Sequence, residues 1–128
     1  MPLLNYNLKI SSVIGGEKSE VEVKASGKKV DGALILEYDY DGTANKLTLE
    51  DKKIVQSRQG VVRLQLNFID GEVTESRIFY GADGGALITY TKSLKVVFCG
   101  DNCKAELLYS FEEGGENNFV SVSAEVCK

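Results

Sequence analysis

The segment from Arg58 to Thr91, RQGVVRLQLNFIDGEVTESRIFYGADGGALITYT, decides the fold. It begins with an apolar set at every second position, Val62 to Phe68, which alternates with polar residues. This period of two is typical of a β-strand with one buried face. Asp70-Gly71 follows, and this dipeptide predicts a two-residue type I′ hairpin turn. The segment therefore reads as three or four antiparallel strands joined by tight turns.

The same pattern continues in both directions along the chain. Strands are expected over 5–13, 19–25, 33–40, 46–50, 53–58, 62–68, 76–80, 86–91, 93–99, 104–111 and 119–127, and 26–32 is expected to be a loop. Turns recur every eight to twelve residues, no helical period is found, and no connection is long enough for a parallel crossover. The sequence predicts one all-β domain over residues 1–128, an antiparallel up-and-down barrel of about 8–10 strands.

Composition narrows the classes of function. The net charge of −4 argues against a nucleic-acid or anionic-membrane binder, because both need a basic surface. The chain has no histidine, which excludes Ser-His-Asp and Cys-His catalysis and the commonest zinc sites. We expect no enzyme activity, no cofactor and no metal. The first ten residues, MPLLNYNLKI, resemble neither a signal peptide nor a membrane span, so a cytoplasmic location is expected.

Short motifs appear along the chain in a characteristic order. They are Leu-x-Tyr at 36–38, Arg-x-Gly at 58–60, Phe-x-x-Gly at 68–71, then Tyr80, Gly85, Thr91, and a second Leu-x-Tyr at 107–109. In this order and spacing the chain resembles the YwiB-like family of small bacterial proteins, whose members look like calycins, the lipocalin-like β-barrels. The resemblance implies an antiparallel barrel of eight to ten strands, and it implies no activity and no site residues, since one fold hosts many functions.

Two arginines are candidates for ligand binding. Arg58 shares strand parity with Ile54 and Gln56, and Arg77 shares parity with Phe79, so both could point into the barrel. An inward guanidinium suits a ligand carboxylate or phosphate. The alternative is that one is a surface residue and the other pairs with an acidic residue across the sheet.

Tyrosines on the predicted strands form the second candidate set. Tyr38, Tyr80 and Tyr109 could line a ligand cavity, because a barrel of about eight strands can hold one small molecule. They could equally be core aromatics whose hydroxyls reach the barrel ends. Cys99 and Cys103 bracket a turn, and we interpret them, with Cys127, as reduced thiols.

Two functional hypotheses follow. The first is a non-enzymatic binding protein whose barrel takes a small anionic or amphipathic ligand through Arg58, Arg77, Tyr38, Tyr80 and Tyr109. The second is a protein–protein interaction module with a filled barrel that acts through an edge strand or a loop rim. In either case we expect a monomer or a homodimer with no nucleic-acid or membrane partner. A cavity of at least ~300 Å³ would favour the first hypothesis, and a core at ordinary packing density would favour the second.

Overall fold

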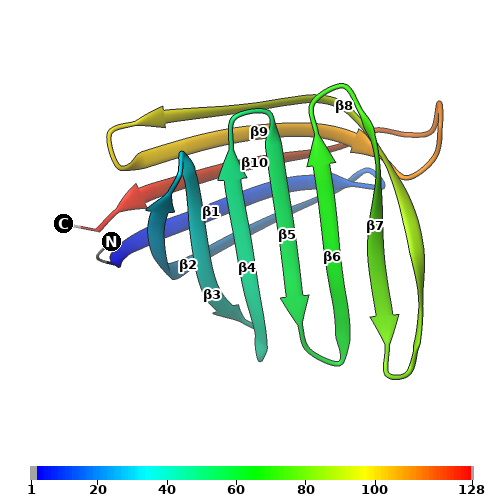
Figure 1. The fold of residues 1–128 in the computed structure, drawn as a ribbon, viewed down its shortest axis with the longest axis horizontal. Coiled ribbons are helices and arrows are strands. Elements are labelled where there is room, and N and C mark those ends of the chain that lie inside the picture. The colour runs from blue at the N-terminus through cyan, green and yellow to red at the C-terminus, as the bar shows by residue number, and fades with distance from the viewer. Residues whose placement is uncertain (1–2, 128) are drawn as a thin grey trace.

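The computed structural model describes residues 3–127 and confirms an all-β, antiparallel, closed barrel of ten strands (Figure 1). Each strand pairs with its neighbours in the chain, and β1 pairs with β10 to close the ring. The strands are β1 (Leu4–Ile14), β2 (Glu17–Val30), β3 (Ala33–Tyr40), β4 (Thr43–Glu50), β5 (Lys53–Gln59), β6 (Val62–Ile69), β7 (Val73–Tyr80), β8 (Asp83–Cys99), β9 (Asn102–Ser110) and β10 (Asn118–Val126).

Turn chemistry explains most of the hairpins. At Asp41-Gly42 both residues have positive φ, 52° and 73°, as a type I′ turn requires. The hairpin predicted at Asp70-Gly71 is present, but the two-residue turn was wrong, because only Gly71 has positive φ and β7 begins at Val73. The Asp70 carboxylate instead accepts a hydrogen bond from the Leu94 backbone N–H at 2.9 Å, which ties this turn to β8.

Two long strands, β2 and β8, form the corners of the barrel, and the strand boundaries predicted from the sequence were wrong for both. The segment 26–32, expected to be a loop, is mostly the end of β2, which pairs with β1 through residues 17–27 and with β3 through 26–30. The two strands expected at 86–91 and 93–99 are one strand, β8, which pairs first with β7 and then with β9. A register shift between Thr91 and Ser93 marks the bend, where one extra residue lets the strand turn.

A glycine allows the β2 corner to close. Gly27 is buried and faces inward, and a Cβ built on it would lie 2.6 Å from Tyr6 Cε2 and 2.8 Å from Leu36 Cδ2. Only a residue without a side chain lets the two strand backbones and the Tyr6 ring come this close. The polar sequence around Gly27 therefore reads as a loop although it forms a strand.

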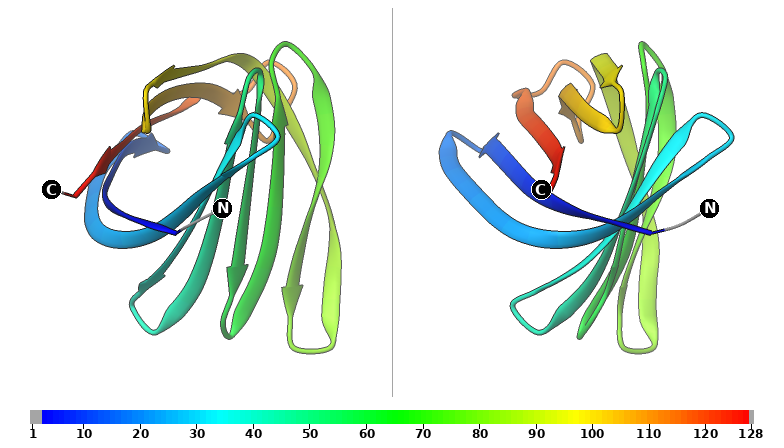
Figure 2. Two further views of the ribbon diagram at one scale, coloured as in Figure 1. Left: turned by 60° about the vertical axis from the view of Figure 1, so that its left-hand side comes forward. Right: turned by 90° about the vertical axis from the view of Figure 1, so that its left-hand side faces the viewer.

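The corners divide the barrel wall into two layers (Figures 1 and 2). One layer contains β3 to β7 with the adjoining parts of β2 and β8, and the other contains β1, β9, β10 and the remaining parts of β2 and β8. The core lies between them and includes Leu8, Leu34, Leu36, Leu49 and Ala124, each at most 1% exposed. The β3–β4, β5–β6 and β7–β8 hairpins project beyond the second layer (Figure 2). Near their ends the inward-facing residues Tyr40, Arg58 and Tyr80 are exposed.

Part of the wall is held by side chains instead of a backbone ladder. The β6–β7 register runs only from Val62–Tyr80 to Gln65–Arg77. Beyond it, the Asn67 N–H donates to Ser76 Oγ at 2.9 Å, and the Asn67 side-chain amide donates to the Glu75 carbonyl at 2.9 Å. These bonds satisfy backbone groups that a splayed strand pair would otherwise leave without partners.

Candidate functional site

One row of side chains crosses the open inner face. The strand register places these residues side by side, one on each of six consecutive strands from β3 to β8, in the order Tyr38, Asn45, Arg58, Leu64, Ile78 and Gly85. Two residues further along three of these strands, on the same side, are Leu36, Leu47 and Leu66, which belong to the core or pack against it, so the row lies on the barrel's inner face. We call this row and its neighbours toward the hairpin ends (Tyr40, Thr43, Val62, Tyr80 and Asp83) the open face.

Arg58 is the only arginine on the open face. Its Nε donates to Asn45 Oδ1 at 3.2 Å, and Asn45 Nδ2 donates in turn to the Thr43 carbonyl at 2.9 Å. Asn45 is 5% exposed, so its amide is a fixed acceptor, whereas Arg58 is exposed. Arg58 forms no ion pair with the carboxylates of residues 3–127. The guanidinium is therefore oriented by a neutral group, and its terminal nitrogens are available.

Tyr38 lies beside this arginine. Its side chain is 8% exposed, and it pairs with Asn45 in the β3–β4 register. Burial raises the pKa of the Tyr38 hydroxyl above its ordinary value, and the positive charge of Arg58 opposes this shift. The structure thus brings together Arg58 and Tyr38, with Asn45 between them.

The rim of the open face exposes large apolar side chains. Tyr40 is 47% exposed at the end of β3, Tyr80 is 59% exposed at the end of β7, and Val61 is 94% exposed in the β5–β6 turn. Deeper in, Leu64 and Ile78 are half-buried. Tyr80 thus lies on the same face as Arg58, two strands away and one step nearer the hairpin ends.

Arg77 lies outside the site. It faces outward on β7, and its Nη2 is 4.0 Å from Glu75 Oε1, with 68% of the arginine side chain exposed. The parity with Phe79 was misleading because Phe79 also faces outward and covers Gly84, where a Cβ would lie 2.1 Å from Phe79 Cδ1. Arg63 stacks on the same ring at 5.6 Å from its centroid. Phe79 therefore belongs to an aromatic–glycine pair on the outer wall and not to the core.

Tyr109 is interior but belongs to the core at the opposite end. It is 4% exposed, and its ring lies 4.7 Å from Phe68 and 5.3 Å from Phe111 between centroids. Burial raises the pKa of the Tyr109 hydroxyl. Its role is aromatic packing, which was the alternative interpretation of the tyrosine set.

The β8–β9 hairpin is fastened over the core by a lysine. Lys29 Nζ donates to the Gly100 carbonyl, lies 3.9 Å from Asp101 Oδ1 and sits 5.3 Å from the Phe98 ring centroid. Tyr6 Oη adds a hydrogen bond to the Asp101 carbonyl at 3.0 Å. This part of the barrel is therefore sealed by polar contacts, in contrast to the open face.

The cysteines are free thiols on different faces. Cys99 is exposed on the outer wall, whereas Cys103 is 1% exposed in the core, so the turn between them does not bring them into a bridge. Burial raises the pKa of Cys103 to about 11, and the charge of Lys29 opposes the shift. Residues 3–127 contain no group of three or more His, Cys, Asp or Glu side chains that could hold a metal ion.

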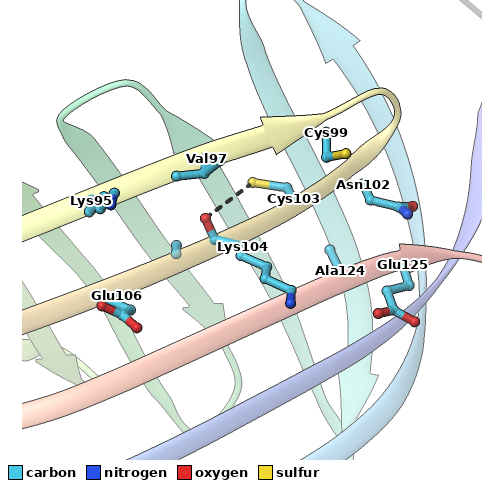
Figure 3. A pocket seen from close by; sticks show the side chains of 10 residues that line it. Lys95, Val97, Cys99, Asn102, Cys103, Lys104, Glu106, Ala124 and Glu125 are labelled. Atoms are coloured by element: carbon cyan, nitrogen blue, oxygen red, sulfur yellow. Dashed lines mark hydrogen bonds between the residues drawn. The ribbon is translucent and has the colours of Figure 1, made fainter.

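None of the surface hollows in residues 3–127 is formed mainly by the open face, although one on the outer side of β2 to β5 also includes Tyr38 and Asn45. The one in Figure 3 has a volume of about 510 Å³ on the outer wall of β8 to β10, and it includes Lys95, Cys99, Lys104 and Glu106. Cys103, drawn there with its contact to the Lys104 carbonyl at 4.0 Å, reaches it only from the inner side. Of five such hollows, none is lined mainly by inward-facing side chains. None of the five is the interior cavity of at least ~300 Å³ expected for a ligand enclosed in the barrel. Solvent reaches inward-facing side chains at the open face, where Tyr40, Arg58 and Tyr80 are exposed.

Sequence reasoning missed four members of the row. Asn45 lay just outside the strand expected at 46–50, Leu64 was assigned to the core and Gly85 to a turn, and the inward parity given to Arg77 and Phe79 turned Ile78 outward. The signal that could have found Asn45 is the hairpin register across Asp51 and Lys52, because counting back from that turn pairs Asn45 with Arg58. No local pattern in the sequence predicts that this face is open, because that depends on where the layer containing β1, β9 and β10 ends.

Comparisons with known proteins add support for the fold. The crystal structure of the ywiB protein from Bacillus subtilis matches this chain with a TM-score of 0.82 at 17% sequence identity, covering 98% of this chain and 94% of that one. No protein-family model matches the sequence, and the comparison with curated proteins found no match. The chain thus has a YwiB-like fold. No helix in the described part of the chain is long and apolar enough to cross a bilayer.

Proposed function

We propose that this protein is a non-enzymatic binding protein that holds a small anionic ligand on the open face. The ligand is bound at the exposed end of the barrel interior, and the packed centre between the two layers serves as its support. The observation that carries this proposal is Arg58, an inward-facing guanidinium whose hydrogen-bond partner is a neutral amide. A charge placed on the inner wall without a carboxylate partner is suited to recognising an anion from solution.

The surroundings of Arg58 strengthen the interaction. Asn45 fixes the Nε side of the guanidinium, so little side-chain freedom is lost when a ligand binds the terminal nitrogens. Tyr38, buried beside it, lowers the local polarity. A carboxylate or phosphate that accepts two parallel hydrogen bonds from Arg58 would fit this arrangement.

The wider classification is part of the same proposal. The order of motifs along the chain, together with the YwiB-like fold, supports membership of the YwiB-like family and a place among the calycin or lipocalin-like barrels. The absence of histidine from the sequence supports a role without catalysis. We place the protein in the cytoplasm as a monomer or homodimer.

A second candidate function is a protein–protein interaction through the rim. Its supporting observation is the exposure of Val61, Tyr40 and Tyr80 at three hairpin ends that project together. Every strand in residues 3–127 is paired on both sides, so this interaction would use the rim and not strand addition at an edge.

Native mass spectrometry of gently purified protein tests the proposal. We expect an additional mass that disappears on denaturation and that is lost in Arg58→Gln. Arg77→Gln is the matched control, because it removes the same charge from the same layer on the outer wall. An adduct retained equally in both variants would contradict the role of Arg58, and a clean homodimer without adduct would favour the rim.

A further inference from the structure

The open face is divided into a polar half and an apolar half. Tyr38, Asn45 and Arg58 occupy β3 to β5, whereas Leu64 and Ile78 occupy β6 and β7. Two residues nearer the hairpin ends the division is only partial, because Val62 lies on β6 but Tyr80 and Asp83 follow on β7 and β8. A ligand whose head is bound at Arg58 would therefore meet apolar side chains in one direction only.

The apolar half ends at a glycine with open space above it. Gly85 is exposed, pairs with Ile78, and has no atom within 4 Å of the position that a Cβ would occupy. Its neighbour Gly84 differs, because there the same position is filled by the Phe79 ring on the outer wall. Gly85 thus extends the surface of Leu64 and Ile78 as a shallow floor with no side chain standing on it.

The length of this surface follows from the strand spacing. From Arg58 on β5 to Gly85 on β8 the row crosses three strand-to-strand steps, which at ~4.8 Å each is about 14 Å. A body of this length, laid across the strands, would cover Leu64 and Ile78 before it reached Gly85. An ion as small as inorganic phosphate would leave the whole apolar half uncovered.

The charges around the face restrict the head of the ligand. Asp41 lies in the β3–β4 turn, and Asp83 lies on the inner face beside Tyr80. One arginine with two carboxylates at the edges of the face is complementary to a single anionic group, and it disfavours polyphosphates and anionic lipid surfaces, which need several cations. Asp83, at the far side of the face, would also repel a head bound in the reverse direction.

We infer that the ligand is a single-headed amphipathic anion, with its carboxylate or phosphate on Arg58 and an apolar body about 14 Å long lying across Leu64 and Ile78 to end over Gly85. This inference rests on the proposed function and specifies its ligand class. Each methylene that leaves water contributes up to about fourfold in affinity. Because an open face covers only one side of the body, we expect about twofold for each methylene.

Calorimetric titration with decanoate, hexanoate and decanol tests the inference. On the unaltered protein, decanoate should bind about tenfold or more tightly than hexanoate, and decanol should bind more weakly than decanoate. Gly85→Phe places a ring on the apolar floor, so it should abolish the preference for decanoate over hexanoate. Gly85→Ala should retain most of the preference, and thermal unfolding of both variants verifies that they are folded.

The two failures can be told apart. If Arg58→Gln leaves decanoate and hexanoate affinity unchanged, or if neither acid binds, the proposed function and this inference both fail. If Arg58→Gln weakens both acids, but their affinities are equal and Gly85→Phe has no effect, the anion site stands and the amphipathic ligand is refuted.

Discussion

Replacing Gly27 by alanine should destabilise the barrel at the corner where β2 passes from one layer to the other. The added Cβ would lie 2.6 Å from Tyr6 Cε2 and 2.8 Å from Leu36 Cδ2. Both neighbours are buried, at 1% and 0% exposure, and the Tyr6 hydroxyl is held by its hydrogen bond to the Asp101 carbonyl. Overpacking of a fixed core costs about 1–3 kcal/mol, and since neither neighbour has room to move we expect the upper half of this range.

Gly85→Ala is the matched control. It is the same substitution in a β-strand of the same barrel, but the new Cβ meets no atom within 4 Å. A glycine that adopts ordinary β-region angles gains about 0.4–1 kcal/mol when replaced by alanine, because the unfolded chain loses freedom. The assay is urea unfolding followed by circular dichroism, which suits a chain without tryptophan. A Gly27→Ala protein as stable as Gly85→Ala would refute the account of the corner.

Three further outcomes are expected. Cys103, whose pKa is raised from 9.0 to about 11, favours the neutral thiol in the folded state, so its contribution to stability is complete below pH 9 and is lost as the pH rises to about 11. Urea unfolding between pH 8 and 11 should show this decline, of at most about 3 kcal/mol, and Cys103→Ala should reduce it; an unchanged decline in the variant would contradict it. Asp70→Ala should lower the free energy of unfolding by about 1–2 kcal/mol by leaving the Leu94 N–H without its acceptor, whereas Asp70→Asn should lose less; equal losses would show that the side-chain oxygen is not the acceptor. Lys29→Met keeps the packing on Phe98 but removes the charge, so it should cost about 1 kcal/mol and speed backbone amide exchange in the β8–β9 hairpin; unchanged exchange would show that Lys29 does not fasten it.

The sequence predicts the fold well because period two and turn residues are local signals. Alternation identifies the buried face within each strand, and Asp41-Gly42 sets a hairpin through the φ angles of two adjacent residues. The corners in β2 and β8 could not be predicted from these local signals. Gly27 is recognised as a strand residue only when the Tyr6 ring packed against it is known, and that contact joins positions far apart in the chain.

The candidate site was predictable in part for the same reason. Arg58 and Tyr38 were placed on the inner face by parity, and the structure brings them together around Asn45. Parity failed for Arg77 because Phe79, the apolar residue used as a guide, covers a glycine on the outer wall. Parity also could not distinguish Tyr109, which lies in the core, from Tyr80, which lies on the open face. Both face inward, and their positions along the barrel depend on the strand register.

The most direct test of the binding account is an NMR titration that observes the arginine Nε–Hε groups. The chain has three arginines, so three signals are expected, and Arg→Gln variants assign them. Decanoate should shift the Arg58 signal in a saturable manner and leave Arg63 and Arg77, which face outward, unchanged. An Arg58 signal that does not move at saturating decanoate, or three signals that move alike, would contradict a ligand site on the open face.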